Sequence, residues 1–130
     1  MQQPLKQVFV VDDDWGIREL MTELLEDAGY AVVTAADGRE ALAYLRSCDV
    51  APCLILLDLN MPVMTGWEFR HEQQGDPALD HIPVAVISAD RSIDTQSVTI
   101  DALAFLAKPI DFQRLLDLVA ACCPTDGRAG

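Results

Sequence analysis

Basic side chains are scarce in this chain of 130 residues: 9 lysines and arginines stand against 21 aspartates and glutamates, giving a formal net charge of −12 at pH 7. This excess of negative charge repels a phosphate backbone or an anionic membrane, which argues against direct contact with either. Long apolar runs are also missing, since none approaches the length of a membrane span, about 20 residues. No basic segment followed by an apolar one opens the chain, so no signal peptide is indicated. We therefore expect a cytoplasmic location.

Metal-binding patterns of cysteine and histidine are missing too. The four cysteines are Cys48, Cys53, Cys122 and Cys123. They show no CxxC or cysteine/histidine ligand spacing, and the adjacent pair suits neither zinc nor an easy disulfide. We expect reduced, mostly structural thiols, with Cys122 or Cys123 open to oxidation. The two histidines, His71 and His81, follow no predicted strand and are interpreted as ordinary helix or loop residues.

Short apolar runs alternate with helical patterns along the whole chain. The runs at residues 8–11, 31–35, 54–57, 84–87 and 104–107 read as strands. This alternation is typical of parallel strands joined by crossover helices, and it predicts the order βαβαβαβαβα with helices on both faces of a five-stranded sheet. A hydrophobic fraction of 51% is enough for one core. We expect a single domain over residues 1–130.

The clearest helical pattern begins near Trp15 and stops at Gly29. Its apolar residues recur at the spacing that predicts one buried helix face. These residues are Ile17, Leu20, Met21, Leu24, Leu25 and Ala28.

Capping residues predict three further helix starts. Asp37 precedes Glu40 by three residues, Thr65 and Glu68 have the spacing of a capping box, and Asp111 precedes the last helical pattern. The inward faces of the second and last helices are assigned to Ala41, Leu42, Leu45, Leu115, Leu116 and Val119. One more helix, the fourth in chain order, is predicted between residues 90 and 104. This segment is rich in β-branched and hydroxyl residues, so the helix is expected to be marginally stable.

Four predicted strands end on polar residues of different kinds. Asp12 and Asp13 follow the first strand, Asp58 the third, Ser88 the fourth and Lys108 the fifth. The carboxyl ends of parallel strands share one edge of the sheet, where ligands bind in open α/β folds. Each residue alone could be a turn or cap residue, and Asp14 is assigned that role. Together they predict one polar site.

Three carboxylates at one edge require a positive partner. At about 5 Å and an effective dielectric constant near 20, each pair of carboxylates repels by roughly 3 kcal/mol. Mg²⁺ takes one or two carboxylates together with water and phosphate oxygens, and so offsets this repulsion. Lys108 adds a compact cation suited to a phosphoryl oxygen.

This set of residues resembles the receiver domain of two-component response regulators. The resemblance covers residues 5 to 122, with 123–130 as a short tail, and it implies the flavodoxin-like, doubly wound α/β sheet with strand order 2-1-3-4-5 and five helices. Met61-Pro62, Gly66 and Lys108-Pro109 match the family's loops. Three positions depart from the common pattern: Thr65 for Asp, Asp101 for Gly and Ser88 for Thr.

The resemblance implies a role for each site residue. Asp58 would accept a phosphoryl group from phosphohistidine, while Lys108 and Ser88 would contact that group. Asp13, Asp58 and the backbone carbonyl of Asn60 would bind Mg²⁺, with Asp12 acting through water; Mn²⁺ is a possible substitute. Ser88 and Phe105 would form the conformational switch, although Phe105 also reads as a core aromatic.

The implied partners are a sensor histidine kinase or phosphotransfer protein and a downstream protein. The chain would be a signalling domain rather than an enzyme in its own right, without an output domain, and either a monomer or a weak phosphorylation-dependent dimer. Two alternatives remain. A haloacid dehalogenase-type phosphatase needs an acid two residues after its nucleophile, where this chain has Asn60. A degenerate receiver that only binds proteins would not need the site residues that are present.

Overall fold

Five parallel strands form one sheet in the order β2-β1-β3-β4-β5. The computed structural model describes residues 6–59, 61, 63–88 and 102–124. The strands are β1 (Gln7–Val11), β2 (Ala31–Ala35), β3 (Leu54–Asp58), β4 (Val84–Ser88) and β5 (Ala104–Ala107). The predicted strands and their order are confirmed.

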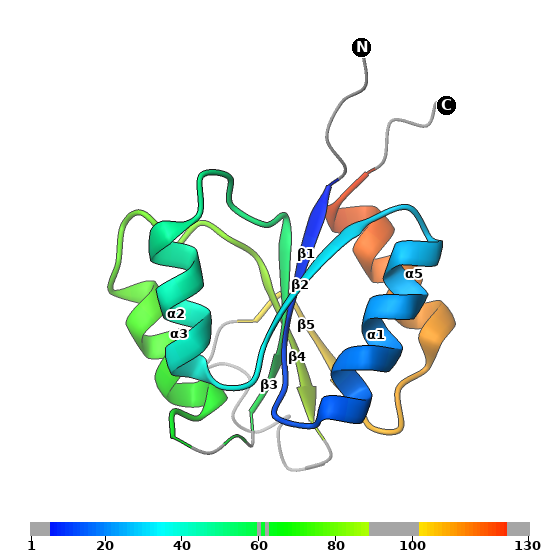
Figure 1. Cartoon of the computed structure of the whole chain (residues 1–130), viewed down its shortest axis with the longest axis horizontal. Helices are drawn as coiled ribbons and strands as arrows, with labels where there is room; N and C mark the ends of the chain where they lie inside the picture. Colours follow the sequence, from blue (N-terminus) through cyan, green and yellow to red (C-terminus); the bar gives the residue numbers. More distant parts are fainter. Residues whose placement is uncertain (1–5, 60, 62, 89–101, 125–130) are drawn as a thin grey trace.

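Helices cover both faces of the sheet. Those in the described residues are α1 (Trp15–Asp27), α2 (Gly38–Ser47), α3 (Gly66–Gln74) and α5 (Phe112–Cys122). Figure 1 shows α2 and α3 on one face and α1 and α5 on the other. The fourth helix predicted between residues 90 and 104 falls mostly outside the described residues.

The sheet is buried on both faces, which is why its central strands are apolar throughout. Successive side chains of a strand point to opposite faces. Phe9 and Val11 accordingly pack in the core beneath α2 and α3, whereas Val8 and Val10 pack in the core beneath α1 and α5. All five residues of β3 and of β4 are buried. The ends of these two strands are therefore held rigidly.

The four described helices begin at the predicted caps. Asp14 Oδ1 accepts hydrogen bonds from the N–H groups of Gly16 (2.8 Å) and Ile17 (3.3 Å). Asp37, Thr65 and Asp111 cap α2, α3 and α5 in the same way. The capping box of α3 is complete, since Glu68 also accepts from the N–H of Thr65 at 2.9 Å. Local hydrogen bonds thus set where each helix starts.

The buried face of α1 is narrower than predicted. Met21 and Leu25 are buried, but Leu20 is 45% exposed and Ala28 is exposed as well. A helix packed on one face of a sheet buries mainly the residues that point at the sheet, and the flanks of its apolar stripe stay open. The predicted inward residues of α2 are all buried, while in α5 Leu115 and Val119 are buried and Leu116 is partly buried. After α1, Gly29 adopts a positive φ of 98°, a conformation that glycine reaches without steric cost.

The prediction that all cysteines are reduced is wrong. Cys53 and Cys123 form a disulfide although 70 positions separate them, while Cys48 and Cys122 are free. Cys53 immediately precedes β3 and Cys123 follows α5, and the fold brings these two points together with 5.7 Å between their Cα atoms. Spacing along the chain could not reveal this pairing, because only the tertiary fold creates the contact.

Within the described residues, no helix is both long and apolar enough to cross a lipid bilayer.

Candidate functional site at the carboxyl edge of the sheet

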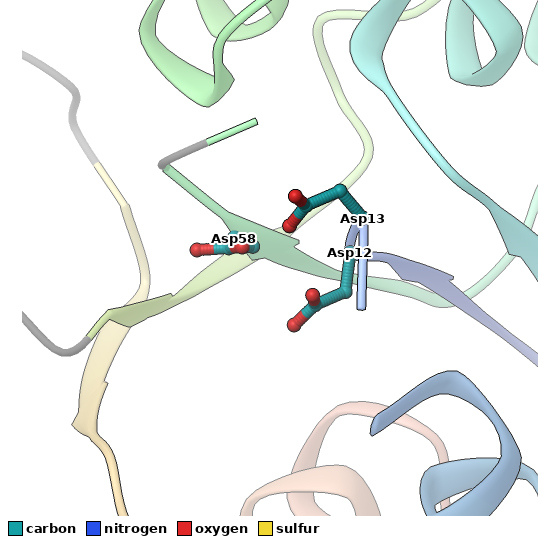
Figure 2. A group of neighbouring side chains, drawn as sticks. All are labelled: Asp12, Asp13 and Asp58. Atoms are coloured by element: carbon teal, nitrogen blue, oxygen red, sulfur yellow. The ribbon is translucent and has the colours of Figure 1, made fainter. Parts of the chain in front are cut away.

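Three carboxylates meet where β1 and β3 end. Oxygen atoms of Asp12, Asp13 and Asp58 all lie within 4.8 Å of one another. Figure 2 shows the first two just after β1 and Asp58 at the end of β3. The sheet brings them together because β1 pairs directly with β3, with Val11 in register with Leu57. The convergence predicted from the strand endings is therefore observed.

The three carboxylates differ in exposure. Asp12 and Asp58 are 2% and 4% exposed, whereas Asp13 is open to solvent. Burial of a carboxylate is costly unless it is paired or hydrogen-bonded. The arrangement leaves Asp13 as the accessible member, beside two carboxylates set into the sheet edge.

Backbone contacts hold Asp12 in place. Its N–H donates to the carbonyl of Ala35 on β2 at 3.1 Å, and its Oδ1 accepts from the N–H of Asp14 at 2.9 Å. Arg18 on α1 donates from Nη1 to the Asp12 carbonyl oxygen at 2.8 Å. This contact of Arg18 depends on the direction in which α1 leaves the strand, and no local sequence pattern signals it. The triple aspartate thus divides into two cluster residues and one helix cap.

Lys108 is a cation at the cluster. Its Nζ lies 3.3 Å from Asp12 Oδ2 and 3.8 Å from Asp58 Oδ2. One ammonium against three carboxylates still leaves an excess of negative charge. All the anionic ligand atoms are oxygens, the type preferred by hard divalent cations. The donor set therefore fits Mg²⁺.

Ser88 stands at the end of β4, beside β3. Asp58 is in register with Ile87, so Ser88 extends one residue further along the same edge. The side chain is 2% exposed, and its backbone carbonyl accepts from the N–H of Lys108 at 3.0 Å. Ser88 therefore fixes the backbone from which Lys108 reaches the carboxylates.

The loop after Asp58 approaches the strand very closely. A Cβ atom added to Gly66 would lie 2.5 Å from the Asp58 carbonyl oxygen and 2.7 Å from Leu59 Cα. The N–H of Gly66 donates to the Leu59 carbonyl at 3.0 Å, closing the loop directly against β3. Only glycine fits such a contact without displacing β3.

Other predicted site residues lie away from the carboxylates or outside the described part. Phe105 is partly buried on β5 and packs against the core beneath α2 and α3, which agrees with its reading as a core aromatic. Asn60, Pro62 and Asp101 fall outside the described residues. His71 lies in α3 and His81 in the turn before β4, which agrees with their prediction as helix or loop residues, and both are exposed.

Comparison with known proteins agrees with this geometry. Residues 8–120 match the family model described as the response regulator receiver domain. Sporulation initiation phosphotransferase F of Bacillus subtilis is 32% identical over 122 residues, which are 92% of this chain and 94% of that protein. The CAI-1 autoinducer sensor kinase/phosphatase CqsS of Vibrio cholerae is 35% identical over 119 residues, and response regulator MprA of Mycolicibacterium vanbaalenii 34% over 127 residues. The matches cover 89% and 93% of this chain but only 17% and 53% of those two proteins.

Solved structures show the same fold. The chemotaxis response regulator CheY4 of Vibrio cholerae superposes with a TM-score of 0.81 at 34% identity, covering 91% of this chain and 98% of that one. The response regulator TrrA of Thermotoga maritima, solved in complex with Mg²⁺ and BeF, gives 0.80 at 29% identity over 91% and 99% of the two chains. With the sheet order, the cluster at its carboxyl edge and a family match over most of its length, this chain belongs to the response regulator receiver domains of two-component signalling.

Proposed function

We propose that Asp58 accepts a phosphoryl group from a phosphohistidine of a partner protein, in a Mg²⁺-dependent reaction. The observation that carries this is the cluster of Asp12, Asp13 and Asp58 with Lys108 at its edge. We also propose that the phosphorylated Asp58 slowly loses its phosphoryl group by self-dephosphorylation. The chain acts as a phosphoacceptor and not as an enzyme with its own substrate.

Each residue has a distinct task in this proposal. A carboxylate oxygen of Asp58 attacks the phosphorus as its bond to the histidine nitrogen breaks, and it remains bonded to the phosphoryl group. Asp13, Asp58 and the Asn60 carbonyl would hold the metal, with Asp12 assisting through water, and Mn²⁺ would be a possible substitute. When bound, the metal supplies positive charge to neutralise the phosphoryl oxygens. Lys108 exchanges its carboxylate contacts for a phosphoryl oxygen.

Ser88 and Phe105 couple phosphorylation of Asp58 to a change in the protein-binding surface. The Ser88 hydroxyl turns toward the new phosphoryl oxygens. Phe105, which lies in β5 three residues before Lys108, changes its packing. A phosphoryl group shifts the population only through contacts that differ between the two states. The phosphorylated chain then signals by contacting a downstream protein. We propose that it is cytoplasmic and is either a monomer or a weak, phosphorylation-dependent dimer.

Exposed apolar residues beside the cluster favour a protein as the donor. Leu20 and Phe112 are 45% and 38% exposed and line one groove with Ile17 and Lys108, close to where Lys108 reaches Asp58. Apolar side chains next to a reacting carboxylate suit a docking surface for a helical kinase or phosphotransfer domain. We propose that the donor binds in this groove.

Phosphorylation is tested with Mg²⁺ and acetyl phosphate, followed by intact mass. The wild type is expected to gain one phosphoryl adduct, which disappears in Asp58→Asn and when Mg²⁺ is omitted. Asp14→Asn is the matched control, since asparagine caps a helix as well as aspartate does and the residue lies outside the cluster. Beryllofluoride binding is measured in parallel, because some receivers react slowly with small donors. An undiminished adduct in Asp58→Asn, or neither an adduct nor beryllofluoride binding in the wild type, contradicts the proposal.

Metal binding is tested through stability. Mg²⁺ that binds only the folded chain raises its free energy of unfolding, by about 2.7 kcal/mol at a concentration 100 times the dissociation constant. Asp13→Asn should lose most of this gain without loss of folding, because Asp13 is exposed. Thermal unfolding at increasing Mg²⁺ measures the effect, and Asp14→Asn should respond like the wild type. Equal stabilisation of Asp13→Asn and wild type would remove Asp13 from the ligand set.

A further inference from the structure

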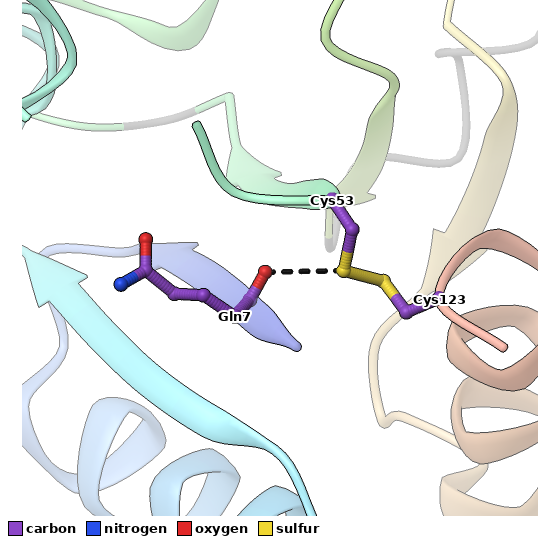
Figure 3. The surroundings of a disulfide bond; sticks show 3 residues. All are labelled: Gln7, Cys53 and Cys123. Carbon is purple, nitrogen blue, oxygen red and sulfur yellow. Dashed lines mark hydrogen bonds between the residues drawn. A yellow bond between two sulfur atoms is a disulfide. The ribbon is translucent and has the colours of Figure 1, made fainter. Parts of the chain in front are cut away.

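A disulfide joins the opposite edge of the sheet to the end of α5. Cys53 immediately precedes β3, whose other end carries Asp58, and Cys123 is the residue that ends α5. Figure 3 shows the bond between the start of β3 and the last turn of that helix. None of the residues of the carboxylate cluster takes part, so the proposed phosphorylation does not explain this bond.

The two sulfur atoms differ in access. Cys123 is fully buried, whereas Cys53 is partly exposed. Exchange begins when a thiolate attacks one sulfur and expels the other, so access decides which sulfur reacts first. An incoming thiolate therefore reaches Cys53 and expels Cys123.

The reduced form of Cys53 has a hydrogen-bond acceptor ready. Its Sγ lies 3.1 Å from the carbonyl oxygen of Gln7, the contact dashed in Figure 3. In the disulfide this sulfur carries no hydrogen, so a hydrogen bond forms there only when Cys53 is a thiol. The same oxygen already accepts from the Cys53 N–H at 2.9 Å, and a carbonyl oxygen has two lone pairs. Reduction thus gains a contact that offsets part of the lost covalent bond.

The neighbouring thiol is a poor internal reductant. Cys122 is free and adjacent in sequence to Cys123, but burial raises the pKa of its thiol. A thiol with a raised pKa is mostly protonated near neutral pH and attacks slowly. Attack by Cys122 would also only move the disulfide to another pair of cysteines, so net reduction of the bond needs an external reductant.

We propose that Cys53 and Cys123 form a thiol–disulfide exchange site, which a dithiol reductant opens at Cys53 to release the last turn of α5 from the sheet. One thiolate of the dithiol bonds to Cys53 Sγ; the Cys53–Cys123 bond breaks and Cys123 leaves as a thiolate that takes up a proton. The second thiol then attacks the mixed disulfide, leaving Cys53 as a thiol and the reductant as its disulfide. Two electrons pass from the dithiol to the protein.

The cytoplasmic location proposed above favours a disulfide that opens and closes. Disulfides of cytosolic proteins are mostly transient, serving catalysis or redox sensing. Here the released element is the end of α5, where, besides the disulfide, Val119 and Cys123 are buried in the core and Leu118 and Cys122 pack against it partly buried. Leu115, one turn earlier, stays buried in the core and keeps the helix docked. The inference concerns release of one turn, not loss of the helix.

The folded full-length chain is equilibrated with mixtures of oxidised and reduced dithiothreitol. Denaturation with an alkylating agent and intact mass then count the thiols. A single transition is expected, from the two free cysteines, Cys48 and Cys122, to four alkylated cysteines. Cys53→Ser should show no transition, whereas the Cys48→Ser/Cys122→Ser double variant should keep it. Resistance of the folded wild type to excess dithiothreitol, or four free thiols that oxidised dithiothreitol cannot pair, overturns the proposal.

Hydrogen exchange by mass spectrometry locates the consequence. Amides of residues 119–123 should exchange at least about tenfold faster in the reduced wild type, while β3 and β4 remain the most protected segments of the chain. Dithiothreitol should change nothing in Cys53→Ser. Unchanged exchange in the last turn, or exchange in β3 and β4 that becomes as fast as in the last turn, contradicts a local release. The wild-type titration decides even if a variant fails to fold, and neither readout involves phosphorylation.

Discussion

Val63 adopts a left-handed backbone conformation in the loop that follows Asp58, with a φ of 67°. For a β-branched residue this conformation is a steric outlier, at a cost of roughly 1–2 kcal/mol. The side chain is 67% exposed and gains little burial in return. Gly66 lies in close contact with Leu59, so the chain must return to β3 within a few residues. We attribute the left-handed conformation of Val63 to this constraint.

Val63→Asn should therefore stabilise the protein. Asparagine tolerates the left-handed region, so we expect a gain of about 1 kcal/mol in the free energy of unfolding. Urea unfolding measures it, and Val50→Asn is the matched control. Val50 is 75% exposed and is not among the described residues with positive φ, so its replacement should change stability by less than about 0.5 kcal/mol. Equal effects at both positions would show that the backbone of Val63 is not strained.

At the scale of elements, α3 depends on its capping box. The helix spans only nine residues, and its buried members are Gly66, Phe69, Arg70 and Gln73. Gln73 donates from Nε2 to the carbonyls of Leu79 and Ile82, which ties the helix to the segment before β4. A short helix with so few apolar anchors gains much of its definition from its first turn.

Thr65→Ala removes the oxygen that accepts from the Glu68 N–H at 3.2 Å. The loss of an N-cap costs about 1 kcal/mol, and faster hydrogen exchange in the first turn of α3 should accompany it. Thr22→Ala serves as the control, because Thr22 lies inside α1 and bonds back to the Arg18 carbonyl at 2.7 Å. Alanine favours a helix interior, so this change should be neutral or stabilising. A loss as large in Thr22→Ala would point to a general effect of the substitution.

The whole molecule is organised between two edges of one sheet. The carboxylate cluster occupies the carboxyl edge, and the Cys53–Cys123 disulfide lies at the start of the strands. β3 runs between them, with Cys53 just before its first residue and Asp58 as its last. The proposed phosphorylation site and the exchange site are thus separated by the full length of a rigid, buried strand.

Reduction of this disulfide should lower global stability. Closing a loop of 70 residues restricts the unfolded chain by about 4 kcal/mol in the chain-entropy model. We expect Cys53→Ser, or wild type in dithiothreitol, to lose stability of that order in urea unfolding, while Cys122→Ser remains close to wild type. Adding dithiothreitol to Cys53→Ser should change nothing more. Wild type that is equally stable with and without dithiothreitol would be at odds with a disulfide that constrains the unfolded chain.

The sequence by itself determined the alternation of strands and helices, the caps at Asp14, Asp37, Thr65 and Asp111, and the polar residues at the strand ends. These features depend on side-chain periodicity and on hydrogen bonds spanning a few residues, which the chain encodes locally. The strand order came from the resemblance to a known family, and the structure confirmed it.

Only the tertiary structure decided which distant groups touch. It paired Cys53 with Cys123, brought Arg18 to the Asp12 carbonyl, placed Lys108 nearer to Asp12 than to Asp58, and left Leu20 exposed on a helix face that looked buried. Such contacts follow from how crossover helices lie on the sheet, and that packing brings together residues whose separation along the chain says nothing about their distance in space.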